Sequence, residues 1–232
     1  MPDFRWDEIP RDLIEARLVL HHAVQLVAAA GQSLLPARPD DSQQSLSLGS
    51  STWLGKAIGD SQVGLEPVEL LLSVRGATLP LGGRTLAEGL DWLTAKLGKP
   101  LVPPAHPPDF PHHPLAEGAR FPEGGLAARR FLADLFAGTQ RILAPHLAPL
   151  RMWPHHFDLA CSLGWVNAGF SPGDGQDGLP YWYMTLAAEP PSLPALGGGG
   201  RWRTSGWKGA ELPIEPRMDG RRVQAFFASV LG

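Results

Sequence analysis

A proline-rich segment near the middle of the chain constrains the fold more than any other feature. Residues 99–122 contain eight prolines and three histidines, with almost no apolar periodicity. Neither a helix nor a central strand is expected there, because proline lacks the backbone N–H that both need. The segment therefore predicts a connector at 99–122 between an N-terminal half (1–98) and a C-terminal half (123–232), together one compact unit.

Apolar spacing predicts the same order of elements in both halves. The helical period predicts helices over 7–30, 84–97, 125–143 and 221–231. Apolar alternation and short apolar runs predict strands over 44–54, 67–75, 157–163, 165–170, 181–187 and 201–207, and a short return strand or a turn at 79–81. This pattern predicts an α+β fold, with antiparallel sheet or sheets that have helices packed on one face. Internal duplication of a helix–strands–helix unit and a chance repetition of this order both remain open.

Composition excludes several classes of partner. The chain has 232 residues, of which 44% are hydrophobic, enough for a packed core. Its 20 basic and 23 acidic residues give a net charge of −3 without a basic cluster, which argues against nucleic-acid binding. The single cysteine, Cys161, cannot form an internal disulfide, so we expect a cytoplasmic protein.

No membrane segment is expected. The N-terminus lacks a basic region followed by an apolar run, and the longest apolar stretch, 19–30, is interrupted by His21, His22 and Gln25. Nothing in the sequence defines an oligomeric state.

The segment from Met152 to Asp174, MWPHHFDLACSLGWVNAGFSPGD, is the strongest candidate for a chemical site. Neighbouring residues on a strand face opposite sides, so His155 and His156 are not expected to share the core, and Asp158 is expected on the face of His156. On the first predicted helix, His21 and Gln25 are four residues apart and point the same way, toward the core. Buried histidine and glutamine need hydrogen-bond partners, and His156 and Asp158 are the expected ones.

These residues suggest a small-molecule pocket between the first helix and the C-terminal hairpin. Candidate catalytic residues are His21, His156 and Asp158, because a His–Asp pair can act as a general base and its orienting group. Expected ligand-binding residues are Gln25, Trp153, Phe170, Asp174, Tyr181 and Trp207. The alternative is a non-catalytic scaffold or partner-binding protein whose polar cluster holds the fold together. Whether the chain is an enzyme stays open.

A metal-dependent enzyme is a third alternative. His21, His156 and Asp158 could form a facial ligand set, but no tight metal motif is present, so we predict no metal and no cofactor. The connector group His106, Asp109, His112 and His113 is a weaker candidate. The turn from Gly169 to Gly178 lacks the lysine of a P-loop and the acidic spacing of an EF-hand.

The chain resembles the bacterial domain-of-unknown-function family 5996 over nearly its whole length. The matching pieces are LHHAVQLV (20–27), SLSLGSSTWLGK, VELLLSVRG, MWPHHFDLA, GFSPGD, PYWY and GWKGAELP. The family pattern falls on His21, Gln25, Phe157 and Asp158. The chain departs from this pattern at Gln43-Gln44, where longer members have a histidine, and at Val166-Asn167, where they have an acidic residue. The resemblance implies a similar fold and a shared pocket, but no activity.

Overall fold

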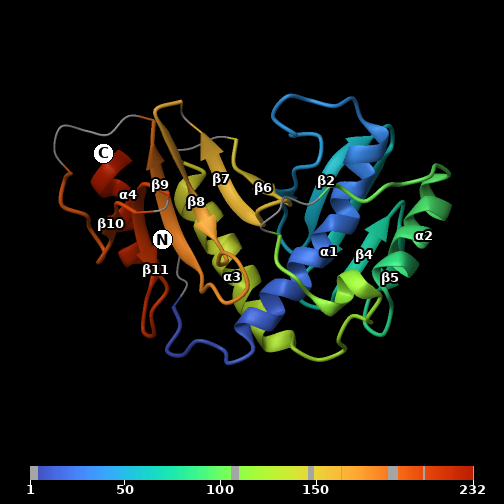
Figure 1. Cartoon of the computed structure of the whole chain (residues 1–232), viewed down its shortest axis with the longest axis horizontal. Coiled ribbons are helices and arrows are strands. Elements are labelled where there is room, and N and C mark those ends of the chain that lie inside the picture. Colours follow the sequence, from blue (N-terminus) through green and yellow to red (C-terminus); the bar gives the residue numbers. More distant parts are fainter. Residues whose placement is uncertain are drawn as a thin grey trace.

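The computed structural model describes residues 5–105, 110–145, 149–162, 164–187, 193–205 and 207–231, which form two helix–sheet–helix units (Figure 1). The first unit consists of α1 (Leu13–Leu34), β1 (Ser47–Leu48), β2 (Trp53–Ile58), β3 (Ser61–Glu66), β4 (Leu71–Val74), β5 (Ala77–Pro80) and α2 (Leu86–Leu97). The second unit consists of α3 (Leu126–Leu143), β6 (Arg151–Trp153), β7 (Asp158–Ser162), β8 (Val166–Ser171), β9 (Tyr181–Leu186), β10 (Arg201–Arg203), β11 (Gly209–Pro213) and α4 (Gly220–Leu231). A short 3₁₀ helix, η1 (Pro114–Glu117), lies in the connector.

Both sheets are antiparallel, which confirms the α+β prediction. Their strand orders are β1-β2-β3-β4-β5 and β10-β11-β9-β8-β7-β6. The two sheets meet where Leu46 and Met152 exchange two backbone hydrogen bonds of 2.9 Å each. α1 packs on β2 and β3, and α3 packs on β8. In Figure 1, α1 lies in front of the first sheet and α3 lies behind the second, so the opposite face of the second sheet is turned toward the viewer.

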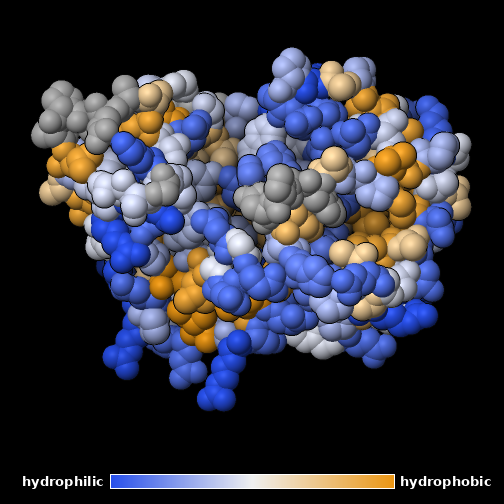
Figure 2. All heavy atoms as spheres, in the orientation of Figure 1, coloured by the Kyte–Doolittle hydropathy of each residue, from blue (hydrophilic) through white to orange (hydrophobic). Residues whose placement is uncertain are grey.

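α1 is the central helix of the molecule. It contacts α2, α3 and the first sheet, and a Cβ on Gly55 of β2 would lie 2.9 Å from the Val27 side chain, so the helix rests directly on the strand. Among the described residues, α1 is also the one helix with the length and apolar character of a membrane span. Its most apolar window is 89% buried within the protein, as a core helix requires. On the face of the molecule seen in Figure 1, hydrophilic residues cover much of the surface (Figure 2).

Some strand predictions differ from the structure. The single strand expected at 44–54 is two strands, β1 and β2, separated by a turn at 49–52. β3, β6 and β11 were not predicted, and the strand expected at 201–207 ends at Arg203. β6 has three residues, too few for alternation to show in the sequence.

The five strands of the first unit each have a counterpart in the second unit. β5 pairs with β4, and β11 pairs with β9, in the same register, so Ala-Thr-Leu-Pro (77–80) and Ala-Glu-Leu-Pro (210–213) occupy equivalent places. One residue further on, Leu81 N–H donates to the Leu70 carbonyl and Ile214 N–H donates to the Pro180 carbonyl, both at 2.9 Å. β10 is the additional strand of the second unit.

Candidate functional site

One face of α1 presents three polar side chains to the second unit. Arg17, His21 and Gln25 are four residues apart and so lie in one row along the helix; all three are buried. The Pro154 carbonyl accepts hydrogen bonds from His21 Nε2 at 3.0 Å and from Gln25 Nε2 at 2.6 Å. His21 and Gln25 therefore point inward as predicted, but they bind a main-chain carbonyl in place of the expected His156 and Asp158.

Residues 154–157 form the turn between β6 and β7. Phe157 closes this turn with a φ of +56° and is fully buried, with its ring stacked 5.2 Å from that of His21. His155 and His156 thus lie in the turn, where strand alternation does not apply. The expectation that His156 faces inward is wrong, because its side chain is exposed, and both histidines reach the same cavity.

That cavity, about 220 Å³ in volume, lies between α1, the β6–β7 turn, the β8–β9 loop and the first residues of β7 and β9. It is lined by six of the predicted site residues: His21, His156, Asp158, Asp174, Tyr181 and Trp207. Trp153 lines an adjoining, more open groove of about 760 Å³ that shares His156, Asp158 and Tyr183 with the cavity. Gln25 and Phe170 do not line the cavity, since Gln25 holds the turn from α1 and Phe170 is fully buried against Phe136 and Trp182.

Asp158 and Tyr183 form one carboxylate–tyrosine pair at the cavity. The Tyr183 hydroxyl donates to Asp158 Oδ2. Burial raises the pKa of Asp158 to about 6, although the Tyr183 hydrogen bond and the nearby His156 act in the opposite direction. Burial and the Asp158 carboxylate also hold the pKa of Tyr183 well above its ordinary value. Asp158 therefore changes charge close to neutral pH, as a group that exchanges protons must.

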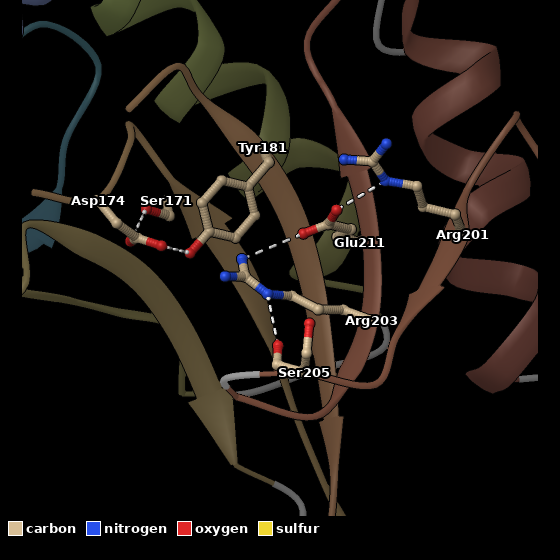
Figure 3. A network of polar contacts seen from close by, with 7 residues as sticks. All are labelled: Ser171, Asp174, Tyr181, Arg201, Arg203, Ser205 and Glu211. Atoms are coloured by element: carbon tan, nitrogen blue, oxygen red, sulfur yellow. Dashed lines mark hydrogen bonds and ion pairs between the residues drawn. The ribbon is translucent and has the colours of Figure 1, made fainter. Parts of the chain in front are cut away.

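Asp174 and Tyr181 form a second pair, which Figure 3 shows. The Tyr181 hydroxyl donates to Asp174 Oδ2 at 2.6 Å, and the Ser171 hydroxyl donates to Oδ1 at 3.3 Å. Burial, and then the hydrogen bond and charge of Asp174, raise the pKa of Tyr181 above its ordinary value. The Trp207 ring stacks on Tyr181 at 6.0 Å and 15°.

Charged side chains from β10 and β11 border this pair. Glu211 binds Arg201 Nε at 2.7 Å and Arg203 Nη1 at 3.5 Å (Figure 3). The Arg203 guanidinium lies 5.0 Å from the centre of the Trp207 ring, within the range of a cation–π contact. Trp207 thus contacts both Tyr181 and Arg203 at one end of the cavity.

Three buried polar atoms of the cavity residues have no hydrogen-bond partner within the described part of the chain. They are Arg17 Nε, Asp158 Oδ1 and Trp207 Nε1. Buried polar atoms are almost always paired, so three unpaired ones around one cavity indicate a place for a polar ligand or for water.

Arg17 and Tyr183 are among the cavity residues that were not predicted from the sequence. Arg17 lies four residues before His21, so the spacing that links His21 to Gln25 would have found it. Tyr183 follows Tyr181 by two residues on β9, so both face the cavity, whereas Trp182 and Met184 between and beyond them are buried on the α3 side. The alternation of residues along this strand would therefore have predicted Tyr183 from Tyr181.

Among the residues that the structure describes, no three His, Cys, Asp or Glu side chains are grouped closely enough to hold a metal ion. Of the connector candidates, His112 binds Glu117 at 2.9 Å and His113 binds Glu15 at 3.2 Å, while His106 and Asp109 lie outside the described residues. Cys161 is buried in β7, and burial raises the pKa of its thiol, which disfavours a nucleophilic role.

Comparisons with known proteins do not identify the chain. No protein-family model matches it, and neither the curated proteins nor the solved structures include a significant match. The resemblance to domain-of-unknown-function family 5996 therefore stays a prediction.

Proposed function

We propose that this protein binds a small polar molecule in the cavity between α1 and the second sheet. The observation that supports this most strongly is the set of three unpaired buried atoms, Arg17 Nε, Asp158 Oδ1 and Trp207 Nε1, around one cavity. A ligand that accepts hydrogen bonds from Arg17 and Trp207 and donates one to Asp158 would satisfy all three. A volume of about 220 Å³ suits a small metabolite, and the adjoining groove offers room for a longer one.

The first unit supports a functional role for the carboxylate–tyrosine pairs. Trp53 pairs with Leu65 as Leu159 pairs with Phe170, so Thr52 stands at the place of Asp158. By the registers of β4 and β9, Leu71 and Ser73 stand at the places of Tyr181 and Tyr183. Because the first unit forms the same strands without these acids and tyrosines, the fold does not require them.

A structural role is favoured for His21 and Gln25, the two residues of the predicted cluster that lie on α1. His21 and Gln25 both bind the Pro154 carbonyl, which fixes the β6–β7 turn on α1. This observation supports the scaffold alternative for those two residues. Asp158, with a pKa of about 6, is the group we assign to proton exchange with the ligand if the protein is an enzyme. We place this function in the cytoplasm, on the evidence of one free cysteine.

Thermal unfolding in the presence of small polar compounds tests the proposal. Amino acids, hydroxy acids, amines, polyols and nucleosides would be screened against the wild-type protein, Asp158→Asn and, as a control, Asp91→Asn on the exposed side of α2. A ligand at about a hundred times its Kd should stabilise the folded state by about 2.7 kcal/mol. We expect such a compound to raise the Tm of the wild type and of the control, but not of Asp158→Asn. A screen in which no stabilisation depends on Asp158 would contradict the proposal.

A further inference from the structure

Each unit uses its first helix to hold a loop of the other unit through a buried arginine. From α1, Arg17 Nη1 donates to the Gly173 and Gly175 carbonyls at 2.8 and 3.0 Å, and Nη2 donates to the Gln176 carbonyl at 2.8 Å. From α3, Arg129 Nε donates to the Val68 carbonyl at 2.7 Å. Both arginines are 2% exposed. The β8–β9 loop and the β3–β4 loop that they bind are equivalent in the two units.

A pair of glutamines repeats this exchange nearer the centre of the molecule. Gln25 of α1 donates to the Pro154 carbonyl, and Gln140 of α3 donates to the Leu48 carbonyl at 3.2 Å. The two glutamine contacts are reciprocal, since each glutamine lies on the first helix of one unit and binds a carbonyl of the other. Their positions are not equivalent, because the strand registers put Leu48 at the place of Met152 and not of Pro154.

We infer that the two units are copies of one α–β–α unit, as their matching strand registers and reciprocal arginine contacts indicate, and that Arg17 is the positioning residue that holds Asp174 in the cavity. The inference about Arg17 rests on the proposed function only in treating the cavity as a ligand site. The contacts of Arg17 themselves exist independently of any ligand. Arg129 is the structural counterpart of Arg17. Its loop presents no acid to a tyrosine, because Leu71 and Ser73 stand where the second unit has Tyr181 and Tyr183.

The contacts of Arg17 bracket Asp174 on both sides. Gly173 has a φ of +122°, and a Cβ there would lie 2.1 Å from the Gly178 carbonyl oxygen, so the loop is tightly closed. The Gly178 N–H donates back to the Asp174 carbonyl at 3.1 Å. With its backbone fixed in this way, Asp174 presents Oδ2 to the Tyr181 hydroxyl. A planar guanidinium spans three carbonyls at once, which a single lysine ammonium cannot do in the same geometry.

The two tyrosines of the chain, Tyr181 and Tyr183, provide a direct readout because both lie in the site. Tyrosinate absorbance would be titrated for the wild type, Arg17→Lys and the matched control Arg129→Lys, with far-ultraviolet circular dichroism to verify folding. We expect Arg17→Lys to shift one tyrosine titration toward the ordinary value by about one pH unit, because the loop releases Asp174. Arg129→Lys should leave both titrations unchanged.

A folded Arg17→Lys with wild-type titrations, or an equal shift in Arg129→Lys, would overturn the inference. If Arg17→Lys does not fold, amide hydrogen exchange of Gly173 and Gly178 in the wild type decides the question. Protection of both amides is expected for a clamped loop, and exchange at the rate of unprotected amides would refute it. None of these measurements needs a ligand, so their failure is distinguishable from failure of the proposed function.

Discussion

The two carboxylate–tyrosine pairs of the site differ in the environment of the acid. Asp158 has one carboxylate oxygen buried without a partner in the described chain, and its pKa is raised to about 6. The Asp174 side chain is more exposed, and both its oxygens accept hydrogen bonds. Two acids in such different surroundings are suited to different tasks, Asp158 to proton exchange and Asp174 to orientation of Tyr181.

Removal of the Asp174 charge should change the titration of Tyr181. Burial contributes most to its raised pKa, and the Asp174 hydrogen bond and charge contribute the rest. In Asp174→Asn we therefore expect one of the two tyrosine titrations to move to lower pH, but not to the value of a free tyrosine. Tyrosinate absorbance measures this shift.

Asp177→Asn is the matched control, because Asp177 is an exposed acid of the same loop. It should leave both tyrosine titrations where they are. An equal shift in the two variants would mean that the general charge of the loop, and not the Tyr181–Asp174 hydrogen bond, sets the titration.

At the scale of secondary-structure elements, the β6–β7 turn is a feature that the sequence did not predict. The four helices were predicted, and the ends of α2 and α3 agree within two residues, because their apolar period and end signals are local. The adjacent His155 and His156 were assigned to a strand, but Phe157 in a left-handed conformation places them in a turn. A buried aromatic residue rarely adopts that conformation, so no local signal announced it. The packing of Phe157 against His21 and Phe136, residues far away in the sequence, stabilises it.

Gln25 of α1 and Gln140 of α3 should both stabilise the contact between the units. Gln140→Ala leaves the Leu48 carbonyl without its side-chain donor, and Gln25→Ala leaves the Pro154 carbonyl with the His21 donor alone. Because each variant loses one hydrogen bond between the units, we expect a loss of unfolding free energy of about 1 to 2 kcal/mol in each. Chemical denaturation measures both values.

Gln32→Ala near the exposed end of α1 controls for the change in helix propensity and should be close to neutral. If Gln25→Ala proved as neutral as this control, the helix-to-turn contact would not be a stabilising one.

At the scale of the whole molecule, the repeated order of elements was predictable, but the way the two units join was not. Each half contains its own helical and strand periods, whereas the Leu46–Met152 pair and the Arg17 contacts bring together residues more than a hundred positions apart. Six cavity residues were predicted, but their arrangement was not, because it also depends on contacts between residues far apart in the sequence. His21 and Asp158 reach one cavity without sharing a hydrogen bond, because Pro154 and Tyr183 bind them.

The purified protein should contain no stoichiometric transition metal. His21 Nε2 already donates to the Pro154 carbonyl, and no three His, Cys, Asp or Glu side chains in the described part of the chain lie close enough together to hold a metal ion. Elemental analysis of protein made without a histidine tag measures this. About one zinc, iron or manganese per chain, lost in His156→Ala, would instead favour a metal-dependent enzyme.

The central claim is that Asp158 is present for function and not for stability. Because its pKa is raised to about 6 in the folded protein, the folded state binds its proton more tightly than the unfolded state does. Its contribution to stability is therefore fully present below about pH 4 and is lost as the pH rises through about 6. The loss is on the order of 2 to 3 kcal/mol before any relaxation around the carboxylate.

The unfolding free energy of Asp158→Asn relative to the wild type at about pH 8, from chemical denaturation, tests this claim most directly. We predict that the variant is as stable as the wild type or more stable, because asparagine occupies the same place without a buried charge. A variant less stable than the wild type by about 1 to 3 kcal/mol would contradict the claim and identify Asp158 as part of the structural framework.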